Sequence, residues 1–279
     1  MSSPVTKRRP LRVGSVPYLV GRPLDLGLGE LDDIELHHAV PAKLVAGLRD
    51  GSVDVAMVSS IELFRQPGYG YINGIAVAGE SEVTSVQVFP TKPLGEVRSV
   101  ALDPASRTAA TLTQVIWPAD LQRPEFIEVA FGQDPREAGA DAWLRIGDLA
   151  LREHIDPSTA EPLNPSRAWR ELTGLPFIFA PWIIAPGVDI EPYLDAFVAA
   201  HQRGKSEIEN LARSAAEEWS VPFERTLHYL SKECLFEPGE RQGPAQLEFR
   251  DRAAALGLAR PDLEPFAVEL PAASRVHGE

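Results

Sequence analysis

The feature that most constrains this chain is a regular alternation, over its first two thirds, between short apolar runs and amphipathic segments. The run VDVAMV at 53–58 is typical of a buried strand, and SSIEL follows it with the hydroxyl and acidic residues that begin helices. Strands that alternate with helices predict an α/β fold with mostly parallel sheets. We expect strands at 11–16, 34–40, 53–58, 71–78, 83–89, 97–103, 125–131, 140–146 and 176–184, and helices from Pro23, over 41–51, after Ser59–Ser60 and over 105–117.

The chain predicts two α/β lobes. GSVDVAMVSSIEL (51–63) and AGADAWLRIGDLAL (138–151) share one order: a small residue, an Asp, an apolar strand and a polar pair that opens a helix. Prolines and a glycine over 90–95 suggest a crossover into the second lobe, with the return near 180–186. We therefore predict lobe one from 1–90 and 185–279 and lobe two from 91–184. The lobes are joined by a two-strand hinge, with a ligand in the cleft.

After Pro186 the pattern changes. Residues 190–257 are rich in Ala, Glu, Arg and Leu and contain no strand-like run. This composition is typical of helices, and the breaks near Gly204, Val221–Pro222 and Pro238–Gly239 divide the segment into three or four of them. A helical C-terminal segment therefore completes lobe one.

Charge limits the partners. Asp and Glu number 40 against 27 Lys and Arg, a formal net charge of −13. The balance argues against nucleic acid and membrane surfaces, because both need a basic face. A small anionic ligand stays compatible if donors are aimed at it locally. No secretory h-region follows the N-terminus, and the longest apolar run, 175–188, is too short to span a bilayer, so we expect a cytoplasmic protein.

Motif searches exclude several chemistries. Cys234 is the single cysteine, which rules out an internal disulfide and a multi-cysteine metal site. The six histidines are scattered and form no HExxH motif, so we predict no metal. Neither GxGxxG after the first strand nor GxxxxGK[ST] occurs, and GxSxG is also missing. We therefore expect no nucleotide cofactor and no hydrolase triad, and the oligomeric state stays open.

The candidate ligand groups follow strand ends, where open α/β sheets bind ligands. Small hydroxyl residues at two predicted helix starts favour an anion, and a guanidinium beside one of them can grip a carboxylate at two points. Plain capping by Ser60 and Ser106 is the alternative. Asp148 is interpreted as a general base or as the cap of the next helix. The candidate substrate-binding residues are Tyr18, Val20, Ser59, Ser60, Thr84, Ser85, Ser106, Arg107, Thr108, Gly147 and Asp148.

Six stretches resemble the chorismate dehydratase family of the futalosine route to menaquinone. In family order they are RVGSVPYLVGRPL, VPAKLVAGLRDGSVDVAMVSSIEL, EVTSVQVF, VALDPASRTAATL, IGDLAL and WRELTGLPFIFAPW, and they cover roughly residues 11–185. The resemblance implies the fold of type II periplasmic binding proteins. It also implies loss of water from chorismate to give 3-[(1-carboxyvinyl)oxy]benzoate, with no cofactor. The alternative function is a cytoplasmic binding protein for a small carboxylate that performs no catalysis.

The first loop departs from the family pattern. The resembling sequences have Tyr-Leu-Asn, two further residues and Pro-Leu, with the Asn against the reacting part of the substrate; this chain has Val20 there. An apolar side chain can neither orient nor accept a proton. Three interpretations stay open: the substrate's own carboxylate is the base and Val20 shapes the pocket; Tyr18 or Ser85 supplies the missing polar contact; or the protein binds a chorismate-like ligand without dehydrating it. The catalytic residue is thus unknown from sequence, with Tyr18 and Ser85 as candidates.

Overall fold

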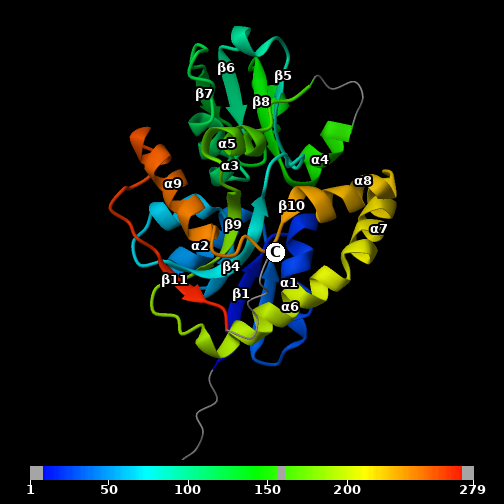
Figure 1. Cartoon of the computed structure of the whole chain (residues 1–279), viewed down its shortest axis with the longest axis vertical. Helices are drawn as coiled ribbons and strands as arrows, with labels where there is room; N and C mark the ends of the chain where they lie inside the picture. The colour runs from blue at the N-terminus through cyan, green and yellow to red at the C-terminus, as the bar shows by residue number, and fades with distance from the viewer. Residues whose placement is uncertain (1–8, 156–160, 272–279) are drawn as a thin grey trace, which may run out of the picture.

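The computed structural model describes residues 9–155 and 161–271, and it has two lobes, each built on its own sheet (Figure 1). The larger sheet has the strand order β10-β4-β9-β3-β1-β2, with β11 also paired to β4. The smaller sheet has the order β5-β8-β6-β7. The predicted α/β fold with two lobes is confirmed.

The larger sheet is mixed. β1 runs parallel to β2 and β3, whereas β9 is antiparallel to both β3 and β4. Its strands are β1 (Leu11–Ser15), β2 (Ile34–His38), β3 (Val55–Met57), β4 (Gly70–Gly79), β9 (Phe177–Ile184), β10 (Cys234–Leu235) and β11 (Phe266–Glu269). The expectation of no strand within 190–257 is wrong for β10, because its two residues pair with the end of β4 and carry no alternating pattern of their own.

Side chains cap the starts of two of the helices that accompany the smaller sheet. Its strands are β5 (Val86–Pro90), β6 (Ser99–Leu102), β7 (Glu125–Glu128) and β8 (Ala142–Ile146), and its helices are α3 (Arg107–Val115), α4 (Gly147–Ile155) and α5 (Pro165–Thr173). Ser106 caps α3 by accepting from the Ala109 amide at 3.2 Å. Asn164 caps α5 by accepting from the Arg167 amide at 2.9 Å.

The two crossings between the lobes lie earlier than the sequence suggested. β4 ends in the larger sheet at Gly79 and β5 begins in the smaller one at Val86, so the chain crosses over 80–85 and not at 90–95. The proline at 90 ends a strand that pairs with β8 along its whole length. The return runs between Leu163, which bridges to Val88, and Phe177, because 180–184 is already inside β9.

Helices cover the larger sheet, and the predicted helical C-terminal segment is confirmed. The helices of this lobe are α1 (Arg22–Asp25), α2 (Pro41–Asp50), α6 (Leu194–Ser206), α7 (Ile208–Trp219), α8 (Phe223–His228) and α9 (Gln242–Ala255). α6 packs closely on α1: a Cβ on Gly204 would lie 2.0 Å from the Pro23 carbonyl oxygen, so only glycine fits there. None of the helices in the described ranges has the length and apolar character needed to cross a membrane.

Candidate functional site

A cavity of about 70 Å³ lies where the two lobes meet. It exceeds the space of a single water several-fold, so it is more than a packing defect. The wall is mostly apolar and includes Val16 and Val20 from the loop after β1, with Phe179 from β9. The lining residues that carry polar side-chain groups are Tyr18, Ser59, Ser85, Ser106 and Cys234, and Gly147 also lines the cavity.

The loop after β1 closes one side of the cavity against α4. The Leu19 amide donates to both oxygens of the Asp148 carboxylate, at 3.0 and 3.3 Å. Beside this bond the Tyr18 ring packs on Gly147, where an added Cβ would lie 3.1 Å from the ring. Gly147 also has φ +67°, so this position requires glycine for both space and backbone conformation. The loop is therefore bound directly to the second lobe.

Burial changes the ionisation of this pair of side chains. It raises the pKa of Asp148 to about 6, against the opposing effect of the Leu19 hydrogen bond. Burial raises the pKa of Tyr18 to about 12, with further contributions from the carboxylates of Asp103 and Asp148. Tyr18 is thus a hydrogen-bond donor near neutral pH. Asp148 does not line the cavity, and its carboxylate faces the Leu19 amide.

A second contact between the two lobes lies at the start of α3. The Thr108 hydroxyl oxygen accepts from the Ile61 amide at 3.2 Å and lies 3.4 Å from the Ser60 hydroxyl. Ser60 and Thr108 are both buried and neither lines the cavity. Ser60 and Thr108, two of the predicted ligand-binding residues, thus hold the lobes together in this conformation.

Arg107, predicted to grip a ligand carboxylate, faces a protein carboxylate. Its guanidinium lies 3.3 Å from Glu62, whose side chain is fully buried. Arg49 at 2.5 Å and Arg65 at 3.6 Å pair with the same carboxylate. A buried carboxylate needs such partners, and Glu62 lies 45 residues from Arg107 in the sequence, which local spacing cannot reveal. Arg107 does not line the cavity as the lobes stand here.

The helix expected after Ser59 has a different form. The segment Ser60–Phe64 is a short 3-10 helix, and Ser59 precedes it without a side-chain capping bond. The strong amide array that an α-helix N-terminus offers an anion is therefore not built at this place. Ser59 lines the cavity instead.

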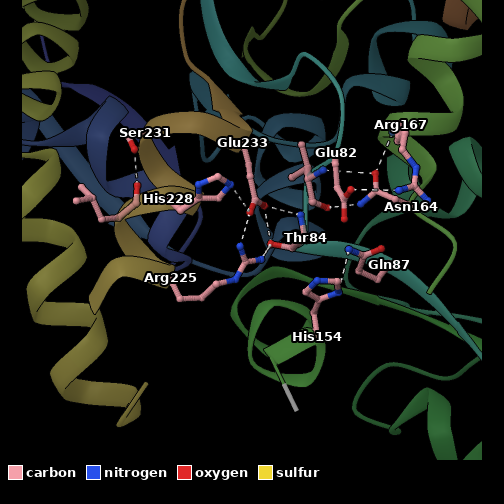
Figure 2. A network of polar contacts seen from close by, with 12 residues as sticks. Glu82, Thr84, Gln87, His154, Asn164, Arg167, Arg225, His228, Ser231 and Glu233 are labelled. Atoms are coloured by element: carbon pink, nitrogen blue, oxygen red, sulfur yellow. Dashed lines mark hydrogen bonds and ion pairs between the residues drawn. The ribbon is translucent and has the colours of Figure 1, made fainter. Parts of the chain in front are cut away.

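The crossing segment 80–85 supplies two of the predicted residues, which behave differently. Ser85 lines the cavity and Thr84 does not. Thr84 is bonded instead to Glu233 and Arg225 (Figure 2). Glu233 and Tyr229, which contacts Ser85, come from the C-terminal helices and were missed by sequence reasoning. The sequence carries no local signal for them, because their partners lie more than 140 positions away.

No group of three or more potential metal-ligating side chains gathers within 9–155 and 161–271. The wall of the cavity is mostly apolar and includes a few hydroxyl-bearing residues. Such a site is typical of small organic ligands that carry a few acceptor groups.

Comparison with known proteins agrees with this architecture. The alkanesulfonate-binding protein of Xanthomonas axonopodis pv. citri, solved bound to MOPS, superposes with a TM-score of 0.70 at 16% identity, covering 95% of this chain and 99% of that one. A solved protein of Archaeoglobus fulgidus gives 0.69 at 17% identity, covering 89% and 98%. A Candida albicans protein described as having the generic periplasmic binding protein fold gives 0.62 at 11% identity, covering 90% and 91%. This chain therefore has a periplasmic-binding-protein-like fold.

Sequence comparison narrows the class. A family model described as menaquinone biosynthesis matches residues 11–255, and the chain belongs to that family. Chorismate dehydratase of Thermus thermophilus is 26% identical over 274 residues, which cover 90% of this chain and 97% of that protein. Chorismate dehydratase of Campylobacter jejuni is 29% identical over 176 residues, covering 60% and 64%. The resemblance seen in the six stretches is confirmed.

Proposed function

We propose that this protein is a chorismate dehydratase, a cytoplasmic hydro-lyase that converts chorismate to 3-[(1-carboxyvinyl)oxy]benzoate and water. The observation that carries the proposal is the match to the Thermus thermophilus enzyme, which extends over 97% of that protein. The match is supported by a cavity in the position expected for the ligand, between the two lobes. The proposed substrate belongs to the class of small carboxylates that the sequence analysis expected.

The reaction makes modest demands on the protein. A ring C–H bond and a C–OH bond break, the proton and hydroxide leave as water, and the ring becomes aromatic. Aromatisation supplies driving force, so the protein mainly holds the substrate and assists proton and hydroxide departure. Four hydroxyl-bearing residues line the cavity, Tyr18, Ser59, Ser85 and Ser106, and their hydroxyls are the candidate donors to substrate carboxylates or to the leaving oxygen.

The wall of the cavity favours one source for the base. The described residues that line it include no carboxylate, imidazole or ammonium side chain. Burial raises the pKa of Tyr18 to about 12, and it raises the pKa of the Cys234 thiol well above its ordinary value. Both groups are therefore protonated near neutral pH. Of the three interpretations of Val20, this composition supports the one in which the substrate's own carboxylate takes the ring proton and Val20 shapes the wall.

A binding protein without catalysis is the second candidate, and one observation favours it. Val20 lines the cavity at the place where the family pattern has Asn, and its side chain is 8% exposed. A wall rebuilt around valine holds a ligand by shape and leaves fewer groups for proton transfer.

Incubation of the purified protein with chorismate tests the proposal. We expect chorismate to disappear and 3-[(1-carboxyvinyl)oxy]benzoate to appear in equal amounts by chromatography, whereas heat-denatured protein gives only the background rate. Turnover no faster than that background would refute the dehydratase. Binding of chorismate in calorimetry without product would establish the second candidate.

A further inference from the structure

The chain passes through a π-helical turn, Tyr229–Glu233, between α8 and β10. The amide of Cys234 bonds back to the carbonyl of Tyr229, five residues earlier. Turns of this type interrupt regular helices and occur frequently at functional sites. Here the turn lies against the crossing segment 80–85. Its first residue contacts Ser85, and its last contacts Thr84.

The last residue of the turn fixes it to the crossing segment (Figure 2). The Glu233 carboxylate, 7% exposed, accepts from the Thr84 amide at 2.8 Å and from the Thr84 hydroxyl at 2.5 Å. Arg225 donates to Glu233 at 2.8 Å and to the Thr84 hydroxyl oxygen at 2.7 Å. Charge-assisted bonds of this kind are stronger than neutral ones, so the turn has a defined position beside the cavity.

The first residue of the turn reaches a lining residue. The Tyr229 hydroxyl donates to the Ser85 hydroxyl oxygen at 2.7 Å, and both side chains are buried. Burial raises the pKa of Tyr229 well above its ordinary value, so the phenol stays protonated and remains a donor. A serine hydroxyl has one proton to donate in addition to its acceptor sites. With Tyr229 donating to its oxygen, Ser85 has that proton available for the cavity that it lines.

We propose that Tyr229 is a positioning residue for the ligand site: it holds the Ser85 hydroxyl in the orientation that donates into the cavity, toward a carboxylate oxygen of the ligand. Tyr229 acts through Ser85 and does not touch the ligand. The identity of that ligand rests on the proposed function. The C-terminal helices thereby contribute to recognition and are more than a cover for the sheet.

Crystal structures of the unliganded wild type and of Tyr229→Phe test the positioning directly. The phenylalanine keeps the ring and removes only the donor. We expect a single Ser85 rotamer in the wild type, and a rotated or divided Ser85 side chain in the variant, with the backbone of 80–85 unchanged. A Ser85 side chain that keeps its wild-type rotamer in Tyr229→Phe would overturn the proposal.

Binding of 3-[(1-carboxyvinyl)oxy]benzoate, which is not turned over, gives the functional readout. We expect Ser85→Ala to raise Kd about tenfold and Tyr229→Phe about fivefold, because each weakens a hydrogen bond to a charged group. The double variant should bind about as weakly as Ser85→Ala alone, since the proposed role of Tyr229 runs through that hydroxyl and not through its other side-chain partner, Cys234. Fully additive losses, or wild-type affinity in Tyr229→Phe, would overturn it.

Tyr71→Phe is the matched control, because Tyr71 is a buried tyrosine of β4 that does not line the cavity. Its Kd should stay at the wild-type value, even where its thermal midpoint falls as far as that of Tyr229→Phe. If the wild type neither converts chorismate nor binds the product, the proposed function fails. The Ser85 rotamer comparison still decides the role of Tyr229 in that case.

Discussion

Two contacts close the cavity, and their electrostatics differ. On one side, Asp148 is held by the Leu19 amide, and burial outweighs the opposing effects of Arg22 and Arg152, so that its pKa rises to about 6. On the other side, next to the bond between Thr108 and the Ile61 amide and counted here as part of that second contact, the fully buried Glu62 is surrounded by the guanidinium groups of Arg49, Arg65 and Arg107. The first contact changes charge near pH 6, whereas the second joins one carboxylate to three guanidinium groups.

The difference shows how each contact contributes to the molecule. The Glu62 cluster places one negative charge among three positive ones, so removing the negative charge leaves unbalanced cations. The Asp148 contact joins a carboxylate to a neutral amide, so its strength depends on whether the proton is present. We infer that the Glu62 cluster mainly stabilises the fold and that the Asp148 contact adjusts how firmly the first loop meets α4.

The largest effect is expected from Glu62→Gln. The substitution keeps the shape but leaves three guanidinium groups without their counter-charge. Loss of one partner of a fully buried pair costs about 3–5 kcal/mol, and the partial exposure of these arginines reduces that to about 2–3 kcal/mol in the free energy of unfolding. Denaturant titration measures it. Glu30→Gln, which breaks an exposed pair with Arg203, is the control and should have a much smaller effect, because solvent screens exposed pairs. Equal losses in both variants would show that the cluster contributes no more than a surface pair.

The next effect concerns the loop of the first contact. Val20→Asn places an amide in an apolar part of the wall, beside Val16. We expect a loss of about 1–2 kcal/mol in the free energy of unfolding, because the amide leaves water without a ready partner. Turnover of chorismate should fall, since the wall is built around valine. Val20→Leu controls for added volume. A faster reaction in Val20→Asn would instead mean that the loop has lost a catalytic group.

Much of this site was predictable because strand ends are visible in sequence. Tyr18, Val20, Ser59, Ser106 and Gly147 all follow apolar runs, and the carboxyl ends of neighbouring strands meet at one edge. These residues line the cavity in the structure, as that rule suggests. Whether each of them binds the substrate stays a prediction.

What could not be predicted depends on contacts across long sequence separations. The helix start placed Arg107 correctly, but its partner Glu62 is set by tertiary packing. The crossing at 80–85 was misplaced because the sequence predicts β5 as a strand but does not indicate which sheet it joins. The turn at Tyr229–Glu233 lacks a strand or motif signal, and only its pairing with the end of β4 brings it to the site.

A smaller effect is expected in the pH dependence of stability. The folded-state pKa of Asp148 is about 6, above its ordinary value of 3.8, so the folded protein holds this proton more tightly than the unfolded chain does. Asp148 therefore stabilises the fold most when protonated, and its contribution falls as pH rises from about 4 to about 6. Arg22, Glu218 and Arg152 also face this carboxylate and modulate the value.

Comparison with Asp148→Asn isolates that contribution, because all other groups titrate in both proteins. Between pH 4 and pH 7 the free energy of unfolding of the wild type should fall by about 1–2 kcal/mol more than that of the variant. This is less than the full shift in pKa would give, because the carboxylate is partly exposed to solvent. The free energy of unfolding at each pH is the measurement. Parallel curves for the two proteins would show that the Asp148 contact does not titrate in this range.

The smallest effect is expected from Arg107→Ala. Arg107 is half exposed, and Glu62 keeps Arg49 and Arg65 when it is removed, so the free energy of unfolding should change by about 1 kcal/mol or less. Because its guanidinium faces Glu62 and not the cavity, the KM for chorismate should rise less than about threefold. Arg123→Ala, an exposed arginine stacked on Phe126 in the same lobe, is the control. A rise of more than tenfold confined to Arg107→Ala would mean that the side chain leaves Glu62 for a substrate carboxylate. The second contact would then belong to recognition as well as to stability.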